Sequence, residues 1–373
     1  MLIGGFLIEY NQSYLFEIEK TAYQNCSFLK NLFFYFLFLE FLLKNVISKK
    51  EVSIKLNYKI LEFIIIVLIS IVYLYFLKTG IPLLKNIHRT TYFNFMVPYY
   101  INFIKGRFSF LCLCCGFLFS KTKAKRFIFY WILIILYYIL CSVKGGEIVG
   151  MIWYFSLPII LTTQSKKEKY KLNSIRKYLV IFFICSFSLL FIAYKKYENY
   201  NKNTTPIEKI IKRFEAGGQI WWFFSDSKQI KPQYRFDKFI NNFNVKKNNS
   251  EKGMQQLMTE IVPKYKLNIW REKGARYQSL SNGFPTIGYY HFRYTGCFLL
   301  IIIIGFFIQQ LKKMIQKACL SDDIFSLLFL SILLEISSRI VAQGDIHLLL
   351  EKRTIVIAIL LFSYKFIKLG VKK

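Results

Sequence analysis

Acidic residues are scarce in this chain, which has 21 Asp and Glu against 52 Lys and Arg, a formal net charge of +31. Histidine is scarcer still, with three residues in 373, and residues 78–107 contain no Asp or Glu. No pair among the eight cysteines has zinc-ligand spacing with a histidine nearby, and no Asp-x-Asp pair is present in the segments that we place outside the membrane below. We therefore expect no metal site and no cofactor.

Several signals of other protein classes are also missing. A net charge of +31 would ordinarily suggest nucleic acid or anionic lipid as a partner, but no RNA- or DNA-binding motif accompanies it. The chain has no internal repeat, no Pro-rich or Gly/Ser-rich linker, and no basic segment before a short apolar run of the kind that marks a cleavable signal. We expect no nucleic-acid partner and interpret most lysines as anchors of membrane topology.

What the chain does have is apolar residues in long runs, with 54% hydrophobic and 19% aromatic residues overall. Such runs predict an all-α, polytopic integral membrane protein with about nine to ten transmembrane helices. The third run, residues 108–120, is so short that its length fits a re-entrant segment as well as a span. The predicted spans are residues 29–46, 60–77, 108–120, 127–142, 147–163, 178–194, 288–308, 324–338 and 354–369.

Basic residues are distributed unequally between the loops that join these spans. Residues 47–59, 121–126, 164–177 and 310–323 form short loops with four, four, six and three basic residues, and the positive-inside rule places them in the cytoplasm. The alternate connections, residues 78–107, 143–146, 195–287 and 339–353, then face outward. This predicts three parts: an N-terminal transmembrane bundle (1–194), a large periplasmic loop (195–287) and C-terminal transmembrane helices (288–373).

The large loop contains two predicted amphipathic helices. Thr205 is a predicted N-cap, Pro206 suits the first helical position, and Glu208 completes a capping box, with an apolar stripe following and Gly217 as the expected stop. A second helix is predicted from about residue 250 to just before Pro263. We expect both helices to form a lid on the membrane surface or over the bundle.

Trp221 and Trp222 follow the first of these helices in the sequence. Because tryptophan favours the boundary between membrane and water, we expect both side chains to lie there.

Arginine is distributed unevenly between the two sides of the membrane. With this topology, nine of the eleven arginines lie on the outer side, where the positive-inside rule expects few basic residues. Guanidinium offers a rigid fork of donors that matches phosphate and carboxylate oxygens, unlike the point charge of lysine. The bias indicates an outer site for a phosphorylated or acidic ligand. The nine are Arg89, Arg107, Arg213, Arg235, Arg271, Arg276, Arg293, Arg339 and Arg353.

Some of these side chains have an ordinary structural interpretation that stays open. Arg213, at the end of the first amphipathic helix, could equally snorkel to the headgroups or interact with the helix dipole. Arg276 could equally form a surface ion pair with a neighbour. Arg235 and Arg353 are interpreted as interfacial anchors.

Three outward segments place ionisable residues at the mouth of the bundle. Lys144 and Glu147 flank two glycines in a tight turn between spans, which makes either an anion-binding corner or a plain ion-paired hairpin. His291 and Arg293 fall in the first turns of the seventh predicted span, where an ionisable residue is a functional candidate. The last outer loop adds Arg339 and Asp345.

These features together resemble the Wzy-type O-antigen polymerases, a family that joins oligosaccharide repeat units. The resemblance is carried by one large late outer loop with Arg213-Phe-Glu-Ala-Gly-Gly-Gln-Ile-Trp-Trp222, by Gly288-Tyr-Tyr-His-Phe-Arg-Tyr-Thr-Gly296 re-entering the membrane, and by the Lys144-Gly-Gly-Glu147 hairpin. It covers most of the chain as architecture, through short motifs. The nine spans assigned here are fewer than the ten or more usual in that family.

The resemblance implies transfer of a growing glycan from undecaprenyl pyrophosphate to the next lipid-linked repeat unit, at the periplasmic face of a bacterial inner membrane. It implies the lipid-linked oligosaccharide and the bilayer as partners, with a polysaccharide chain-length regulator as a further candidate. A pyrophosphate leaving group requires fixed positive charge, and the acceptor hydroxyl a base. The candidate substrate-binding residues are Lys144, Arg213, Arg276, Arg293, Arg339 and Arg89, and the candidate bases are Glu147, His291 and Asp345.

Two other functions remain open. An O-antigen ligase shares the scaffold, but its usual spacing from histidine to a distant glycine is missing around His291. A lipid-linked glycan flippase or other transporter would normally have more spans and shorter loops. Multispanning glycosyltransferases that use lipid-phosphate sugars are disfavoured, because they usually need carboxylates in the first outer loop.

Overall fold

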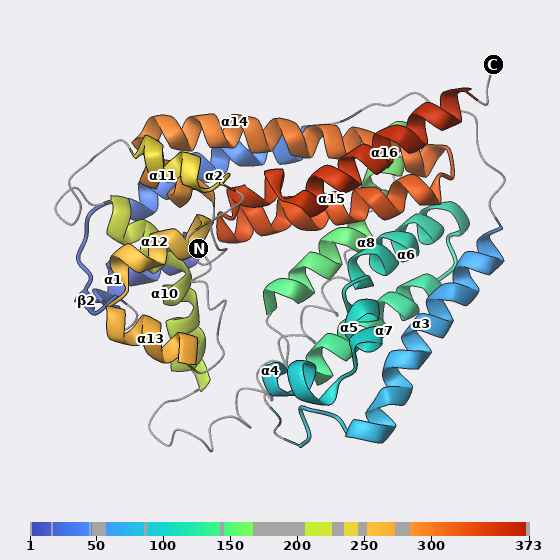
Figure 1. The fold of residues 1–373 in the computed structure, drawn as a ribbon, viewed down its shortest axis with the longest axis horizontal. Helices are drawn as coiled ribbons and strands as arrows, with labels where there is room; N and C mark the ends of the chain where they lie inside the picture. The colour runs from blue at the N-terminus through green and yellow to red at the C-terminus, as the bar shows by residue number, and fades with distance from the viewer. Residues whose placement is uncertain are drawn as a thin grey trace. The chain divides into compact units, whose positions relative to one another are not determined.

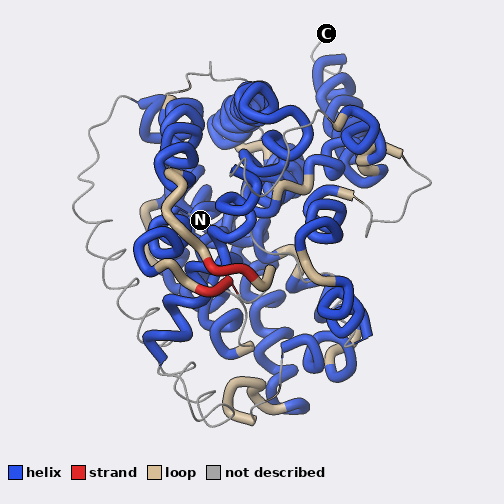
Figure 2. The backbone as a smooth tube through the Cα atoms, turned by 90° about the vertical axis from the view of Figure 1, so that its left-hand side faces the viewer, coloured by secondary structure: helices blue, strands red, loops and turns tan. Residues whose placement is uncertain are grey.

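The computed structural model describes residues 2–15, 18–44, 46, 57–85, 87, 89–141, 145–166, 206–225, 235–244, 252–272 and 284–370. These residues are mostly helical, with one short pair of antiparallel strands (Figure 2). The all-α class predicted from the sequence is therefore confirmed. The chain divides into two compact units, each built from three separate segments.

Unit 1 comprises Met1–Lys44, Ile207–Gln310 and Leu333–Leu360, so it contains the N-terminal residues and most of the predicted outer loop. In Figure 1, α1, α10, α12 and α13 group together within it. Its elements are α1 (Leu2–Asn11), β1 (Tyr14–Leu15), β2 (Lys20–Thr21), α2 (Ser27–Leu43), α10 (Pro206–Ser225), α11 (Phe236–Asn241), α12 (Gly253–Ile261), α13 (Lys264–Glu272), the 3₁₀-helix η4 (Ile346–Leu350) and parts of α14 (Phe284–Leu320), α15 (Ile324–Gln343) and α16 (Lys352–Gly370).

Unit 2 comprises Asn45–Pro206, Leu311–Ile332 and Leu361–Lys373. Besides the remaining parts of α14, α15 and α16 it contains α3 (Tyr58–Thr79), α4 (Arg89–Thr91), the π-helical turn η1 (Tyr92–Met96), α5 (Tyr99–Lys105), α6 (Phe108–Thr122), α7 (Arg126–Leu140) and α8 (Gly145–Lys166).

The core of unit 2 is helix α6, which is buried around most of its circumference and packs against α7 and α8. A Cβ on Gly116 would lie 2.0 Å from the carbonyl oxygen of Phe155, so only glycine permits this approach of α6 to α8. Trp131 of α7 stacks on Phe155 with 4.6 Å between ring centroids, and its indole donates to the Met151 carbonyl at 3.2 Å. These contacts hold the three helices together through close backbone approach and aromatic packing.

Within the described ranges, three helices are long and apolar enough to cross a membrane, namely Tyr58–Thr79, Pro285–Leu320 and Ile324–Gln343. A fourth span is formed if α5 and α6, bent by 41° at a short break, are taken together as a broken span or a re-entrant loop. The third predicted run therefore keeps its double interpretation. Each other predicted span coincides with a helix, except residues 178–194, which lie outside the described residues.

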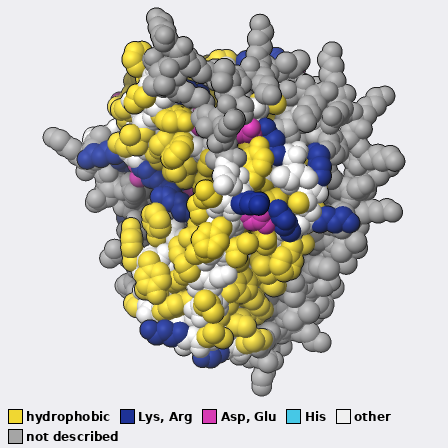
Figure 3. Space-filling view, turned by 90° about the vertical axis from the view of Figure 1, so that its right-hand side faces the viewer, with side chains coloured by type: hydrophobic (Ala, Val, Ile, Leu, Met, Phe, Trp, Pro, Cys, Tyr) yellow, Lys and Arg dark blue, Asp and Glu magenta, His cyan; other side chains and the backbone are white. Residues whose placement is uncertain are grey.

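Large apolar side chains are exposed along several of these helices. On α3 they include Phe63 and Leu77, on α14 Ile302 and Phe306, and on α16 several more, among them Phe362, Phe366 and Ile367. Figure 3 shows hydrophobic side chains over much of one face of the molecule, with charged groups between them. Apolar surface of this extent is typical of a protein that contacts lipid.

Helix α10 begins at Pro206 as the capping signals predict, but it does not stop at Gly217. It continues to Ser225, because the next residue, Gly218, packs on α1. A Cβ on Gly218 would lie 2.4 Å from the amide nitrogen of Gly5, and one on Gly4 would lie 1.9 Å from the carbonyl oxygen of Phe214. The glycine that follows the predicted stop therefore permits two helices to touch backbone to backbone.

The expectation that Trp221 and Trp222 lie at the membrane boundary is also wrong, because both are fully buried inside unit 1. Trp221 donates its indole hydrogen to the Ser27 carbonyl at 2.7 Å, and Trp222 donates to the Tyr23 carbonyl at 2.9 Å. The two indoles thus attach α10 to the segment that starts α2.

The second predicted amphipathic helix is confirmed as α12, which ends at Ile261 before Pro263. Its apolar stripe faces inward, with Leu257, Met258 and Ile261 all buried. The stripe serves as core of unit 1.

Candidate functional site

Helix α14 is broken at Phe292 (φ −138°, ψ 22°) and Arg293 (φ 57°, ψ −143°), within a candidate membrane span. Residues eight apart in a continuous helix are separated by about 12 Å. Here the backbones of Gly288 and Gly296 touch: a Cβ on Gly288 would lie 2.6 Å from the carbonyl oxygen of Gly296, and one on Gly296 would lie 2.1 Å from that of Gly288. The two parts of α14 therefore fold back on each other, with His291 and Arg293 at the turn.

The short helix α11 covers this turn. The backbone N–H of Arg235 donates to the His291 carbonyl at 2.9 Å, which supplies a partner for a carbonyl at the end of the first half-helix. The Phe239 ring packs edge-on against His291 and Phe292, with 5.4 and 5.0 Å between centroids. His291 is consequently only 1% exposed.

Asn242, just after α11, holds the His291 ring. Its amide nitrogen lies 3.1 Å from Nε2 of His291 and also donates to the Lys238 and Phe239 carbonyls at 3.1 and 3.3 Å. Its amide oxygen accepts the backbone N–H of Gly253 at 2.5 Å. Asn242 thereby connects α14 with the first residue of α12.

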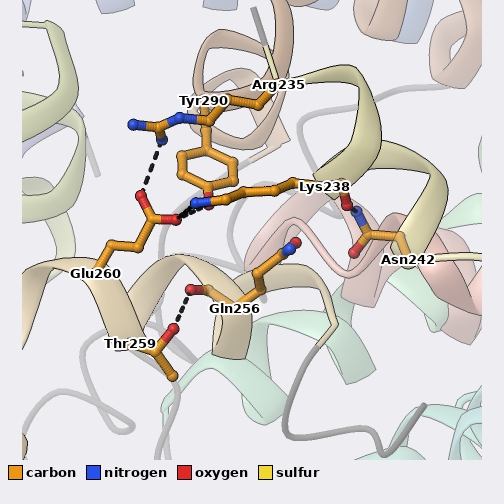
Figure 4. Close-up of polar contacts among 7 residues, drawn as sticks. All are labelled: Arg235, Lys238, Asn242, Gln256, Thr259, Glu260 and Tyr290. Atoms are coloured by element: carbon orange, nitrogen blue, oxygen red, sulfur yellow. Dashed lines mark hydrogen bonds and ion pairs between the residues drawn. The ribbon is translucent and has the colours of Figure 1, made fainter. Parts of the chain in front are cut away.

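Glu260, near the end of α12, collects donors from two other elements (Figure 4). Arg235 Nη1 lies 3.0 Å from its Oε2, and Lys238 Nζ and the Tyr290 hydroxyl both bond its Oε1. The Arg235 guanidinium also lies over the Tyr290 ring, 4.5 Å from the centroid. Two cations meet one carboxylate here, which leaves an excess of positive charge next to the turn in α14.

On the other side of Asn242, Gly253 packs under the segment that leads into η4. Gly253 has φ +54°, and a Cβ there would lie 2.9 Å from His347 Nδ1 and 3.0 Å from Asp345 Oδ1. Arg339 Nη2 lies 3.8 Å from Asp345 Oδ2. Glycine is needed at position 253 both for its backbone angle and for this contact.

Burial, with further contributions from Lys252 and Arg339, lowers the pKa of His347 to about 4. The ring is therefore neutral at physiological pH. We call Asn242, Gly253, His291, Asp345 and His347 the polar cluster, together with four neighbouring cations of unit 1, namely Arg235, Lys238, Arg293 and Arg339.

Four of the nine candidate residues lie in or beside the polar cluster. His291 and Arg293 form the turn in α14, and Arg339 pairs with Asp345 at the end of α15. The link between the two pairs runs through Asn242 and Gly253.

The other candidates lie elsewhere or cannot be placed. Arg213 is in α10, but its side chain is not among those described, and Lys144 and Arg276 lie outside the described residues. Glu147, exposed in the first turn of α8, and Arg89 of α4 belong to unit 2, where both lie close enough to Lys105 for their charges to act on it.

Several residues of the site were not predicted from the sequence. Arg235, expected to be an interfacial anchor, instead pairs with Glu260. Neither Glu260 nor Asn242 has a sequence signal, because each meets its partners through the fold. Tyr290 could have been noticed, since it lies next to His291 within the segment that carries the family resemblance.

Among the residues that the structure describes, no three His, Cys, Asp or Glu side chains come together as metal ligands would. What the described site contains is cations, two imidazoles, two carboxylates and neutral donors. Such a set can bind an anionic group and move a hydroxyl proton.

Comparison with known proteins adds one match. Residues 247–358 match a family described as "Family of unknown function (DUF6418)". No curated protein and no solved structure matches the chain. The matched segment is under a third of the chain, yet it contains Gly253, Glu260, His291, Asp345 and His347. The similarity to this family thus covers much of the polar cluster, while α11 and Asn242 lie just before it.

Proposed function

We propose that this protein is a glycan polymerase of a bacterial inner membrane, which extends oligosaccharide repeat units carried on undecaprenyl pyrophosphate. The observation that supports this most is the broken helix α14, which sets His291 and Arg293 at a turn within a candidate span. Broken helices in membrane proteins commonly line polar substrate sites, because freed backbone groups and charged side chains meet there.

The chemistry of the reaction fits the polar cluster. The bond between the anomeric carbon of the donor glycan and a pyrophosphate oxygen breaks, and that carbon forms a bond to the acceptor hydroxyl oxygen. The hydroxyl proton passes to a base, and undecaprenyl pyrophosphate leaves with its negative charge. Arg293 and Arg339, joined by Arg235 and Lys238, supply fixed positive charge for the leaving group. Asp345 is the carboxylate of the cluster suited to accept the proton.

The proposal includes a multi-pass topology of about nine to ten spans. Contacts inside unit 2 support the alternation of loops. Lys121 pairs with Asp322 at 2.6 Å, which joins two of the loops assigned to the cytoplasm. The Leu83 N–H donates to the Leu140 carbonyl at 3.0 Å, near two connections assigned to the outside. Reporter fusions after Lys169 and after Lys202 are expected to report opposite sides, and equal signals would overturn the topology.

The central test is activity of the purified, full-length protein on lipid-linked repeat units. We expect a ladder of products, made also in excess chelator because arginine and lysine supply the charge that a metal would otherwise provide. Activity that is lost with EDTA and restored by Mg²⁺ would contradict the metal-free mechanism. A deletion strain separates the alternatives: loss of a polymerase leaves single repeats, loss of a ligase leaves polymer unattached, and loss of a flippase leaves neither outside.

Variants of arginine test the site itself. Arg293→Ala and Arg293→Lys are both expected to lose most activity, because lysine lacks the paired donors of guanidinium. Arg353, exposed in α16, serves as the matched control and should tolerate either change. Normal polymer from Arg293→Ala at normal protein level would remove Arg293 from the mechanism.

A further inference from the structure

The first outward connection, residues 78–107, is basic and has no acidic residue. Its basic residues are Lys78, Lys85, Arg89, Lys105 and Arg107. They lie on a side of the membrane where the positive-inside rule expects few such residues. The last two flank Gly106, at the break where α5 and α6 are bent by 41°. Positive charge therefore gathers at an interruption in a candidate span.

In the proposed topology this break lies within the apolar layer of the membrane. Helix α6 has 15 residues, so it is about 22 Å long, whereas the hydrocarbon core of a bilayer is about 30 Å thick. A tilt of α6 would shorten its reach further. Because residues 121–126 are assigned to the cytoplasm, the opposite end of α6 falls short of the outer boundary. Ionisable residues at that depth, here Lys105 and Arg107, are functional candidates.

Lys105 is held at the break by aromatic rings from two other elements. Its Nζ lies 3.7 Å from the centroid of the Phe93 ring in η1 and 6.0 Å from that of the Tyr138 ring in α7. The Asn102 amide donates to the Phe93 carbonyl at 2.9 Å, which fixes η1 against α5. A lysine that only avoided the apolar layer would extend toward the headgroups. The ammonium of Lys105 instead lies against these rings, where cation–π attraction keeps its charge.

The charge of Lys105 is not neutralised by direct contact with a carboxylate. Among the residues that the structure describes, none forms an ion pair with Lys105 or accepts a hydrogen bond from its Nζ. Glu147 lies close enough for its charge to act on Lys105, but so does Arg89 with the opposite sign. The break therefore carries an excess of positive charge, which fits an anion.

A stripe of exposed aromatic side chains on α5 leads to Arg107. Tyr99 and Phe103 are four residues apart and so lie on one face of the helix, where they are 83% and 51% exposed. The Arg107 guanidinium lies over the Phe103 ring, 4.8 Å from its centroid. An apolar tail can lie along this aromatic stripe while a phosphate meets Arg107, whose guanidinium offers paired donors.

We propose that the break between α5 and α6 binds the anionic phosphate headgroup of a lipid. Lys105 and Arg107 are the ligands of the phosphate, and the aromatic stripe contacts the tail. Free pyrophosphate shares the headgroup chemistry, but only a lipid uses both parts of this surface. The site belongs to unit 2, whereas the polar cluster belongs to unit 1. It goes beyond the polymerase reaction and does not depend on it.

The test measures how fast Lys105 is acetylated by trace reagent in the full-length protein, followed by mass spectrometry of its peptides. One sample is in nanodiscs of phosphatidylcholine, a second in nanodiscs that also contain phosphatidic acid, and a third in phosphatidylcholine with inorganic pyrophosphate in solution. We expect phosphatidic acid to slow the reaction about tenfold when it is present near ten times its Kd, by mass action. Pyrophosphate should slow it less.

Lys78 is the internal control of this measurement, because it is an exposed lysine of the same connection. It should react at one rate in all three samples. A rate of Lys105 that phosphatidic acid leaves unchanged would overturn the site. Equal protection by pyrophosphate and by phosphatidic acid would overturn the part of the aromatic stripe.

Arg107→Gln tests the second ligand. We expect it to abolish the protection of Lys105 by phosphatidic acid, while the rate without phosphatidic acid stays the same because the break keeps its fold. Arg126→Gln is the matched control. Arg126 also lies at the start of a helix and over a phenylalanine ring, 5.4 Å from the centroid of Phe127, but it pairs with Glu62 at 2.7 Å. Full protection in Arg107→Gln would contradict the role of Arg107.

Tyr99→Ala tests the aromatic stripe separately from the charges. It should raise the phosphatidic acid content needed for half protection of Lys105 and leave the effect of pyrophosphate unchanged, because only the tail contacts Tyr99. A half-protection point equal to that of the unmodified protein would show that the tail does not lie on this residue.

Discussion

The fold-back of α14 can be tested by the sign of one substitution, Gly296→Ala. In a continuous exposed helix, replacing glycine by alanine stabilises by up to about 1 kcal/mol, because alanine has the higher helix propensity. At position 296 the new Cβ would lie 2.1 Å from the Gly288 carbonyl oxygen and 2.8 Å from Phe292 Cβ. The first contact is with backbone, so it is relieved only if the two half-helices separate.

Forcing extra volume into such a contact costs about 1–3 kcal/mol, which outweighs the propensity gain. We therefore expect a lower Tm for Gly296→Ala, measured on the purified full-length protein in detergent, together with loss of polymerase activity because His291 and Arg293 are displaced. Gly150→Ala is the control, since its Cβ would meet only a Tyr154 ring carbon at 3.7 Å. We expect Gly150→Ala to leave Tm unchanged or raise it. A Tm for Gly296→Ala at or above that of the unmodified protein would refute the fold-back.

Three further outcomes follow from the contacts of unit 1. Trp222→Phe leaves the Tyr23 carbonyl without its indole partner and should lower the free energy of unfolding by about 1–2 kcal/mol in denaturant titrations. Glu260→Gln removes the charge that pairs with Arg235, and we expect a loss of similar size that shrinks when Arg235 is also replaced by Gln. Because the pKa of His347 is lowered to about 4, its contribution to stability is complete above the unfolded value near 6.5 and is lost as pH falls from there toward 4. His347→Gln should flatten the dependence of Tm on pH in that window, and an unchanged slope would contradict this burial.

The helical elements could be predicted from the sequence because their signals are local. The apolar run at 60–77 corresponds to α3, and the apolar stripe before Pro263 corresponds to α12. The start of α10 follows from Pro206 at its first position. Each of these signals depends on residues within a few positions of one another, so apolar periodicity and capping residues are enough to predict the helix.

The same local rules failed where distant segments meet. Gly217 was a reasonable stop signal, yet α10 continues because the next residue, Gly218, contacts the α1 backbone. Trp221 and Trp222 have the composition of boundary residues, but the fold supplies carbonyl partners that allow their burial. The segments that make these contacts, α1 and the residues around the start of α2, are far from α10 in the sequence, so local signals do not reveal them.

By itself, the sequence determined that this is a helical protein with apolar runs of a kind that can cross a membrane, and it identified His291 and Arg293 as candidates through their position at a predicted span. Only the tertiary structure decided that α14 folds back at those residues, that Glu260 meets Arg235, and that Asn242 orients His291. The physical reason is that charge and apolar periodicity are properties of the chain, whereas a contact such as the hydrogen bond between Asn242 and His291 joins residues 49 positions apart.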